Sequence, residues 1–281
     1  MSTPQTSVTT ETAIDRVSSR DGTPIAYQRT GEGPAVILVD GAMGYRAFGS
    51  SLTLASLLAP HLTVLAYDRR GRGESGDTQP YAPEREIEDI EALIDVAGGQ
   101  ASLYGISSGG ALALEAASAL GDRVPRLGLY EIPYDSSDDG VRLWREYRAQ
   151  LSDVLAAGQR GEAAVLFMKL VGASPEGVKG MQAQPVWATV EAIAPTLAYD
   201  AAVLGEDRTV PVSRAALVTA QTLVMDGSAS LEPMPFMRAT ALELVHAIPS
   251  AQHRVVQDQS HEVAAEVIAP ILAEFFSGGG R

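Results

Sequence analysis

The sequence predicts an α/β protein built around a mostly parallel central sheet. Two observations carry this prediction: short apolar runs recur along the chain, and amphipathic helical patterns lie between them. A third observation is a break in the alternation, because residues 134–205 read as several helices with no strand among them. We therefore expect a core formed by residues 1–133 and 206–281 and an inserted helical cap at 134–205.

A hairpin opens the predicted sheet, after a polar stretch at the start of the chain. The segments "AIDRVSS" and "TPIAYQRT" flank "RDGT", in which Asp21-Gly22 is a strong hairpin signal. The later runs have the continuous apolar character of strands buried on both faces of a parallel sheet. They are "AVILV" (35–39), "LTVLAYD" (62–68), "ASLYGI" (101–106), "RLGLYE" (126–131), "TLVMD" (222–226) and "HRVVQ" (253–257).

Helical patterns stand between these runs, as crossover connections would. In "EREIEDIEALIDVAGG" (84–99) the apolar residues share one face, and two glycines end the pattern. "SGGALALEAASAL" (108–120) and "EVAAEVIAPILAEFF" (262–276) are two further helices. Because strands joined by helices run parallel, only the hairpin is expected to be antiparallel. The inserted helices would then cover the carboxyl edge, where such sheets bind ligands.

The composition limits the partners and the chemistry. A formal net charge of -14 over 281 residues disfavours nucleic acid and anionic membranes, since both attract basic surfaces. The chain has no cysteine, which excludes thiolate chemistry and is typical of a cytoplasmic protein. We read no signal peptide in the N-terminal stretch and no apolar segment long enough to cross a membrane. We expect a small-molecule substrate, no metal and no cofactor, with a homodimer as the one assembly considered.

The stretch "YGISSGG" (104–110) carries the main chemical signal. Gly105 and Gly109 place Ser107 at the centre of G-x-S-x-G, whereas a frame centred on Ser108 would need glycine at position 106. A serine on a sharp strand-to-helix turn needs such small neighbours, and its hydroxyl then projects from the sheet edge. A phosphate loop would require a lysine after the glycines, and none is present. We interpret Ser107 as a nucleophile.

Five segments together resemble the α/β-hydrolase superfamily, in the order in which that fold would place them. They are "AVILVDGAMGYRAF" (35–48), "LTVLAYDRRGRGESG" (62–76), "YGISSGG", "LYEIP" (129–133) and "DQSHEV" (258–263). The resemblance implies the α/β-hydrolase fold with a helical cap, and it implies little about the substrate. It also implies a structural loop at 68–76, whose arginines we expect to be loop and surface anchors.

Of the four histidines, His261 is the predicted base. It follows the last strand on a short loop, at the carboxyl edge, and the superfamily order of serine before histidine agrees. The other three, His61, His246 and His253, are expected at the surface or in packing contacts.

The acid of the triad stays open among three carboxylates. The superfamily pattern after the seventh strand, glycine and then aspartate three positions later, has Ser230 in the acid position here. Glu131 is favoured, because it ends an apolar strand and the similar haloalkane dehalogenases carry their acid there. Asp226 and Glu232 are the alternatives.

The resemblance also implies an oxyanion hole formed by the backbone amides of Ser108 and Ala42. Asp40 stands where the family usually has histidine, and we expect its carboxylate to turn away and cap backbone donors. Met43, Trp144 and Trp187 are candidates for lining the substrate pocket.

The leading functional hypothesis is a serine hydrolase that cleaves an ester or lactone of a largely apolar substrate through an acyl-enzyme. A lyase or C–C bond hydrolase on the same scaffold is the first alternative, and a ligand-binding receptor is the second. Dehalogenase and epoxide-hydrolase chemistry uses an aspartate nucleophile in this fold and is disfavoured by Ser107.

Overall fold

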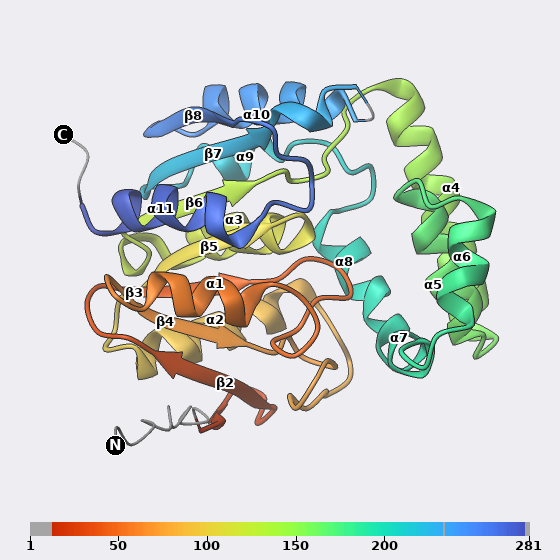
Figure 1. Cartoon of the computed structure of the whole chain (residues 1–281), viewed down its shortest axis with the longest axis horizontal. Coiled ribbons are helices and arrows are strands. Elements are labelled where there is room, and N and C mark those ends of the chain that lie inside the picture. Colours follow the sequence, from red (N-terminus) through yellow and green to blue (C-terminus); the bar gives the residue numbers. More distant parts are fainter. Residues whose placement is uncertain (1–12, 233, 279–281) are drawn as a thin grey trace, which may run out of the picture.

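The computed structural model describes residues 13–232 and 234–278, so the N-terminal stretch read for a signal peptide and the end of "SGGGR" lie outside the described residues. An eight-stranded sheet in the order β1-β2-β4-β3-β5-β6-β7-β8 forms the centre (Figure 1). The pairs β1–β2 and β2–β4 are antiparallel, and the other pairs are parallel. The strands are β1 (Asp15–Ser18), β2 (Pro24–Thr30), β3 (Ala35–Val39), β4 (Thr63–Tyr67), β5 (Ser102–Ile106), β6 (Arg126–Tyr130), β7 (Gln221–Gly227) and β8 (Ala251–Val256).

The strand order determines where a site can form. Since β3 lies between β4 and β5, the crossover direction reverses there, and the loops after β3 and β5 meet at the carboxyl edge. In open α/β sheets such a reversal is the usual place for a ligand. The hairpin expected around Asp21-Gly22 is present, with Gly22 at a φ of 85°.

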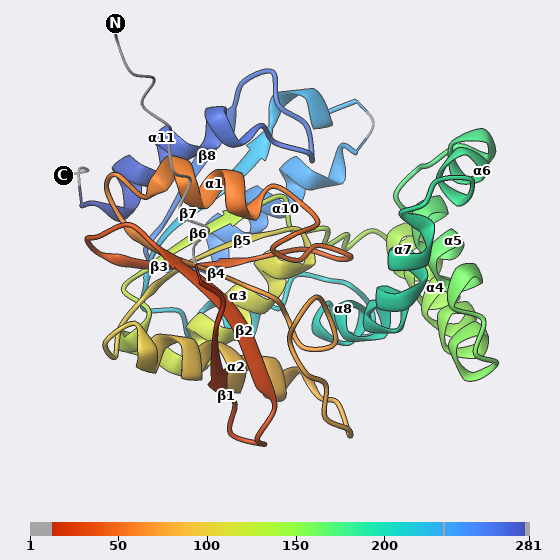
Figure 2. The same ribbon diagram turned by 60° about the horizontal axis from the view of Figure 1, so that its bottom comes forward.

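Helices cover both faces of the sheet, as Figure 2 shows. Val36 and Leu38 pack with α1 and α11 on one face, while Ile37 and Val39 belong to the core under α2, α3 and α10 on the other. This alternation explains why the run is apolar throughout. The helices of these two layers are α1 (Ser51–Leu58), α2 (Pro83–Val96), α3 (Ser108–Leu120), α9 (Val212–Ala215), α10 (Phe236–Ala247) and α11 (Ala265–Phe276).

The segment 134–205, called the helical insertion below, lies between β6 and β7 and contains no strand. Its helices project beyond the carboxyl ends of the strands, and α8 lies nearest the sheet (Figures 1 and 2). Serine side chains cap two of them: Ser137 accepts from the Gly140 amide and Ser174 from the Gly177 amide, each at 3.1 Å. The helices are α4 (Asp138–Ala156), α5 (Arg160–Leu170), α6 (Pro175–Gln182), α7 (Trp187–Ile193) and α8 (Leu197–Val203). Among the described residues, no helix has the length and apolar character to cross a bilayer.

Candidate active site

Ser107 occupies the sharp turn between β5 and α3. Its backbone has φ 56° and ψ -133°, a conformation that a residue with a side chain adopts only when its surroundings enforce it. A methyl group at Gly105 would lie 2.5 Å from the Gly109 carbonyl oxygen, and one at Gly109 would lie 2.2 Å from that of Val39. Both glycines that frame the serine are therefore required by close backbone approach, as the sequence predicts.

The loop after β3 lies against Ser107. A methyl group at Gly41 would be 2.9 Å from the Ser107 Cβ atom and 3.5 Å from its Oγ atom. The neighbouring amide of Ala42 is thus close to the serine, and Ser108 is the first residue of α3, where an amide has no acceptor within the helix. In the described part of the chain neither of these two amides donates a hydrogen bond. Met43, which follows Ala42 in this loop and is a candidate pocket residue from the sequence, has a positive φ of 64°.

The Asp40 carboxylate bonds to a side chain and accepts from no backbone amide among the described residues, so the expected capping role is wrong. Its Oδ1 atom accepts a hydrogen bond of 2.5 Å from the Ser51 hydroxyl at the start of α1. Its Oδ2 atom is buried and has no partner in the described chain. Burial raises the pKa of Asp40, while the Ser51 hydroxyl and the charges of Arg72 and Arg69 oppose that rise.

Glu131 and His261 are in direct contact. Glu131 Oε2 lies 3.0 Å from His261 Nδ1, and Glu131 Oε1 accepts a 2.8 Å hydrogen bond from the Gly227 amide. The Glu131 side chain is fully buried, whereas that of His261 is 31% exposed. The contact expected from the sequence is present, and its part in catalysis stays a prediction.

The loop that carries His261 is held by the ends of the neighbouring strands. The Tyr130 hydroxyl donates to the Ser260 carbonyl at 2.6 Å, and the Ala229 amide donates to the Gln259 carbonyl at 2.9 Å. Gly227 allows this approach, because a methyl group there would lie 2.1 Å from the Gln259 carbonyl oxygen. Ser107 and His261 project from the same edge, and no hydrogen bond joins them within residues 13–232 and 234–278. Catalytic hydrogen bonds often form only once substrate is bound.

The two alternative acids are placed elsewhere. Asp226 is buried and accepts from Arg238 Nε, and its Oδ1 atom is 2.5 Å from His253 Nε2. Glu232 is exposed to solvent, as are His61 and His246. His253 is half-buried, and its ring contacts the Asp226 carboxylate, a contact that the sequence did not indicate.

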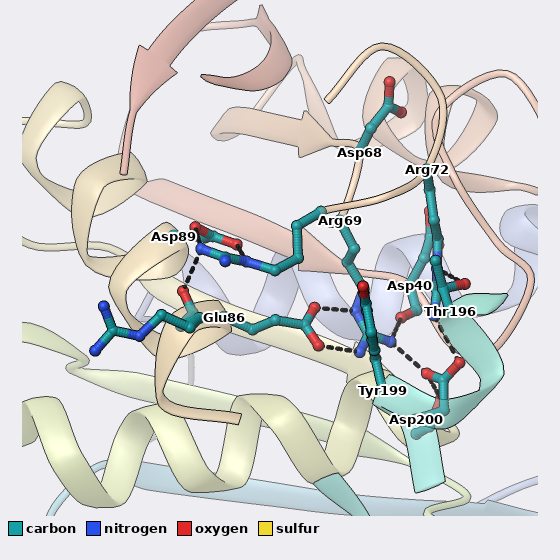
Figure 3. Close-up of polar contacts among 12 residues, drawn as sticks. Asp40, Asp68, Arg69, Arg72, Glu86, Asp89, Thr196, Tyr199 and Asp200 are labelled. Carbon is teal, nitrogen blue, oxygen red and sulfur yellow. Dashed lines mark hydrogen bonds and ion pairs between the residues drawn. The ribbon is translucent and has the colours of Figure 1, made fainter. Parts of the chain in front are cut away.

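The arginines at 69, 70 and 72 are not surface anchors, and here too the expectation is wrong. All three are buried, and each pairs with a carboxylate. Arg69 and Arg72 share Asp200 of α8 (Figure 3). Asp200 also accepts a 2.8 Å hydrogen bond from the Ser108 hydroxyl. Sequence reasoning missed Asp200, and the available signal was three clustered arginines that would need carboxylates if buried.

The pocket candidates of the helical insertion differ in burial. Trp144 is buried, its ring packs on Tyr147, and its Nε1 atom donates to the Gly205 carbonyl at 2.9 Å. Trp187 begins α7 and is partly exposed. Trp144 thus has a packing role of its own, and contact of either ring with substrate stays a prediction.

Comparison with known proteins places these features in a family. A model of the alpha/beta hydrolase family matches residues 36–266, which include Ser107, Glu131 and His261. The chain belongs to the alpha/beta hydrolase family. The match supports a hydrolase and leaves the substrate open. A proline iminopeptidase of Pestalotiopsis fici is 31% identical over 112 residues, which span 38% of this chain and 40% of that relative.

Solved structures share the fold over most of this hydrolase. An alpha/beta hydrolase from Sphaerobacter thermophilus is 49% identical, with a TM-score of 0.82, over 93% of this chain and 100% of that one. A thermophilic esterase from Thermogutta terrifontis is 21% identical, with a TM-score of 0.70, over 95% of this chain and 98% of that one. A proline iminopeptidase from Mycobacterium smegmatis is also 21% identical, with a TM-score of 0.64, over 95% and 98% of the two chains. The last two likenesses concern the fold alone.

Proposed function

We propose that this hydrolase cleaves a carboxylic ester or lactone through an acyl-enzyme formed on Ser107. The observation that carries the proposal is the 3.0 Å contact of buried Glu131 with His261 Nδ1, at the same sheet edge as the strained serine. A carboxylate on Nδ1 fixes the tautomer that leaves Nε2 free to accept a proton. Beside Ser107, such a pair would act as the base that takes the hydroxyl proton.

The proposed reaction has two halves. Ser107 Oγ attacks the carbonyl carbon while His261 takes its proton, and the oxyanion that forms is stabilised by the Ala42 and Ser108 amides. His261 then gives the proton to the leaving alcohol, and the acyl-enzyme remains. A water molecule repeats the sequence and releases the acid. Glu131 stabilises the imidazolium in both halves without taking the proton itself.

The helical insertion is the proposed lid over this site. Its position beyond the strand ends supports that role (Figure 1). Its apolar composition fits a largely apolar substrate, for which Met43, Trp144 and Trp187 are candidate contacts.

The test combines covalent labelling with turnover. We expect a fluorophosphonate to add once, at Ser107, and a panel of esters and lactones, to which a prolyl anilide is added for comparison, to include ester or lactone substrates. Ser107→Ala should abolish both labelling and turnover. A panel in which only a prolyl anilide is cleaved would replace the ester proposal with a peptidase, and a wild type that is neither labelled nor active on any member would refute a serine hydrolase.

A further inference from the structure

One buried carboxylate, Asp200, contacts Ser108 and the two arginines that bond to the loop presenting the Ala42 amide. Asp200 Oδ1 accepts a hydrogen bond from Arg69 Nη1 at 2.7 Å, and its Oδ2 atom accepts one from Arg72 Nη2 at 2.6 Å (Figure 3). Oδ1 also accepts one from the Ser108 hydroxyl at 2.8 Å. Burial alone would raise the pKa of Asp200, but Arg72 and Arg69 outweigh it and hold the pKa below its usual value. Asp200 is therefore a carboxylate anion that accepts hydrogen bonds from three side chains.

Arg72 extends this contact to the loop after β3. Its Nη1 atom donates to the Gly41 carbonyl at 2.6 Å and to the Gly44 carbonyl at 3.2 Å. The Gly41 carbonyl and the Ala42 amide belong to one planar peptide unit, in which a trans bond points them in opposite directions. Holding the carbonyl therefore fixes the direction of the Ala42 N–H. The hydrogen bond also polarises the peptide, which makes that N–H a better donor.

Arg69 holds the preceding peptide and balances the charge. Its Nη1 atom also donates to the Asp40 carbonyl at 3.2 Å, and its Nε and Nη2 atoms bind both oxygens of Glu86 at 2.7 Å. Since arginine stays charged in proteins, the two buried cations need two carboxylates. Asp200 supplies one of them from 131 residues away in the sequence.

We propose that Asp200 is a positioning residue, which orients the Ala42 amide through Arg72 and the Ser108 residue through its hydroxyl, and so makes α8 of the helical insertion part of the oxyanion hole. The inference rests on the proposed function, because only acyl transfer uses the hole. Asp200 itself touches no reacting atom.

A matched control lies in the adjacent ion pair. Arg70 follows Arg69 in the same loop, is equally buried, and binds Asp89 of α2 through Nε and Nη2 at 2.8 and 2.7 Å. Neither side chain bonds to the 40–44 loop among the described contacts. Asp89→Asn therefore breaks a comparable buried pair without touching the proposed hole.

The experiment compares Asp200→Asn and Asp89→Asn in three measurements at a temperature at which both are folded. These are the melting temperature, kcat and KM on the best ester substrate, and amide hydrogen exchange in peptides covering residues 40–46. We expect Asp200→Asn to lower kcat by about 10- to 100-fold, less than outright loss of an oxyanion donor, with KM changed by less than about threefold because ground-state binding is kept. Exchange at 40–46 should become faster. Asp89→Asn should keep kcat within about threefold, since it alters stability only.

The proposal would be overturned if the two variants lost kcat equally, or if Asp200→Asn changed KM and left kcat unchanged. Unchanged exchange at 40–46 in Asp200→Asn would do the same. If Asp200→Asn does not fold, Ser108→Ala replaces it, because it removes one hydrogen bond to Asp200 and leaves both arginine pairs. Ser108→Ala should then lower kcat by about 3- to 10-fold at unchanged KM, the loss of one charge-assisted hydrogen bond, and full activity would refute the link.

The exchange measurement separates this inference from the proposed function. It needs no substrate, so it tests whether Asp200 holds the 40–44 loop in place even if the wild type is inactive. A wild type that is inactive and is not labelled by fluorophosphonate refutes the hydrolase mechanism. An active wild type whose kcat is unchanged in Asp200→Asn refutes only the positioning role.

Discussion

Glu131 and Asp226 end neighbouring strands, yet only Glu131 reaches His261. Tyr130 pairs with Met225, so the two carboxylates stand side by side at the sheet edge. Glu131 has a positive φ of 44°, which interrupts the strand alternation at this residue, and its carboxylate lies between the Gly227 amide and His261. Asp226 stays within its strand and pairs with Arg238 and His253. The two carboxylates thus differ in backbone conformation and in partners, and Glu131 is the one that contacts His261.

Replacing Glu131 by glutamine should reduce kcat by about 10³- to 10⁴-fold, since the amide cannot hold the same tautomer or stabilise the imidazolium. KM should change little, because Glu131 is proposed to act on the histidine and not on the substrate. The measurement is steady-state hydrolysis of an ester together with the melting temperature.

Asp226→Asn and Glu232→Gln are the controls for that prediction. Asp226→Asn should lower the melting temperature, because Arg238 loses its buried partner, and should leave most of kcat. Glu232 is exposed, so its variant should resemble the wild type. A larger kcat loss in either control than in Glu131→Gln would make that carboxylate the acid.

At the scale of elements, the turn between β5 and α3 depends on close packing of backbone. Gly109→Ala would place a methyl group 2.2 Å from one β3 carbonyl oxygen and 2.4 Å from that of Asp40. We expect the turn to shift, with loss of fluorophosphonate labelling and a lower melting temperature. Gly180→Ala in α6 is the control, since no atom lies within 4 Å of the added methyl and alanine favours a helix by up to about 1 kcal/mol. Normal labelling in Gly109→Ala would contradict the strained geometry.

Trp144 lies in the helical insertion and belongs to the same apolar cluster as the sheet residues Ile37 and Val39. Its ring stands 5.3 Å from that of Tyr147, and the Arg208 guanidinium lies 5.2 Å from its centroid. Trp144→Phe should lower the melting temperature through the lost hydrogen bond to Gly205 and the lost packing. KM should stay within about twofold over esters of increasing chain length if the ring only packs. A chain-length-dependent rise in KM would make Trp144 a substrate contact instead.

Elements with a local signal could be predicted from the sequence, and contacts between distant segments could not. The apolar run at 35–39 and the glycines around Ser107 predict their strand and turn, because burial on two faces and close backbone approach each demand particular residue types. Asp200 has no such signal, since "LAYDAAV" reads as an ordinary helix with one exposed acid. Its burial follows from where α8 docks, which is a property of the tertiary fold. Glu131, by contrast, is favoured over Asp226 from the sequence, and its contact with His261 is present.

At the scale of the molecule, buried ion pairs join segments that are far apart in sequence. Arg70 connects the β1–β2 turn to α2 through Asp21 and Asp89, and Arg46 connects the loop after β3 to Asp68 after β4. Asp200 adds the helical insertion to this set. We therefore expect the insertion to unfold together with the core in a single transition, which scanning calorimetry can check by comparing calorimetric and van't Hoff enthalpies.

The pH dependence of stability should carry the signature of Asp200. Its pKa is lowered in the folded state by Arg72 and Arg69 against the opposing effect of burial, while the unfolded chain restores an ordinary value of about 3.9. A carboxylate with a lowered folded pKa stabilises the protein fully above its unfolded pKa, and the contribution disappears as the pH falls through the folded value. Asp200→Asn lacks this titration and leaves two buried cations short of one partner, at a cost of about 3–5 kcal/mol at neutral pH.

Denaturant titrations of wild type and variant should therefore give a constant difference in unfolding free energy from pH 7 to about 5, which narrows as the pH falls below about 4. Other carboxylates titrate in both proteins, so the difference isolates Asp200. Asp207→Asn removes the partly exposed partner of Arg145 and should show a small, salt-sensitive difference throughout. A difference for Asp200→Asn that stays constant down to pH 2 would mean that this carboxylate is not the ionised partner of Arg69 and Arg72.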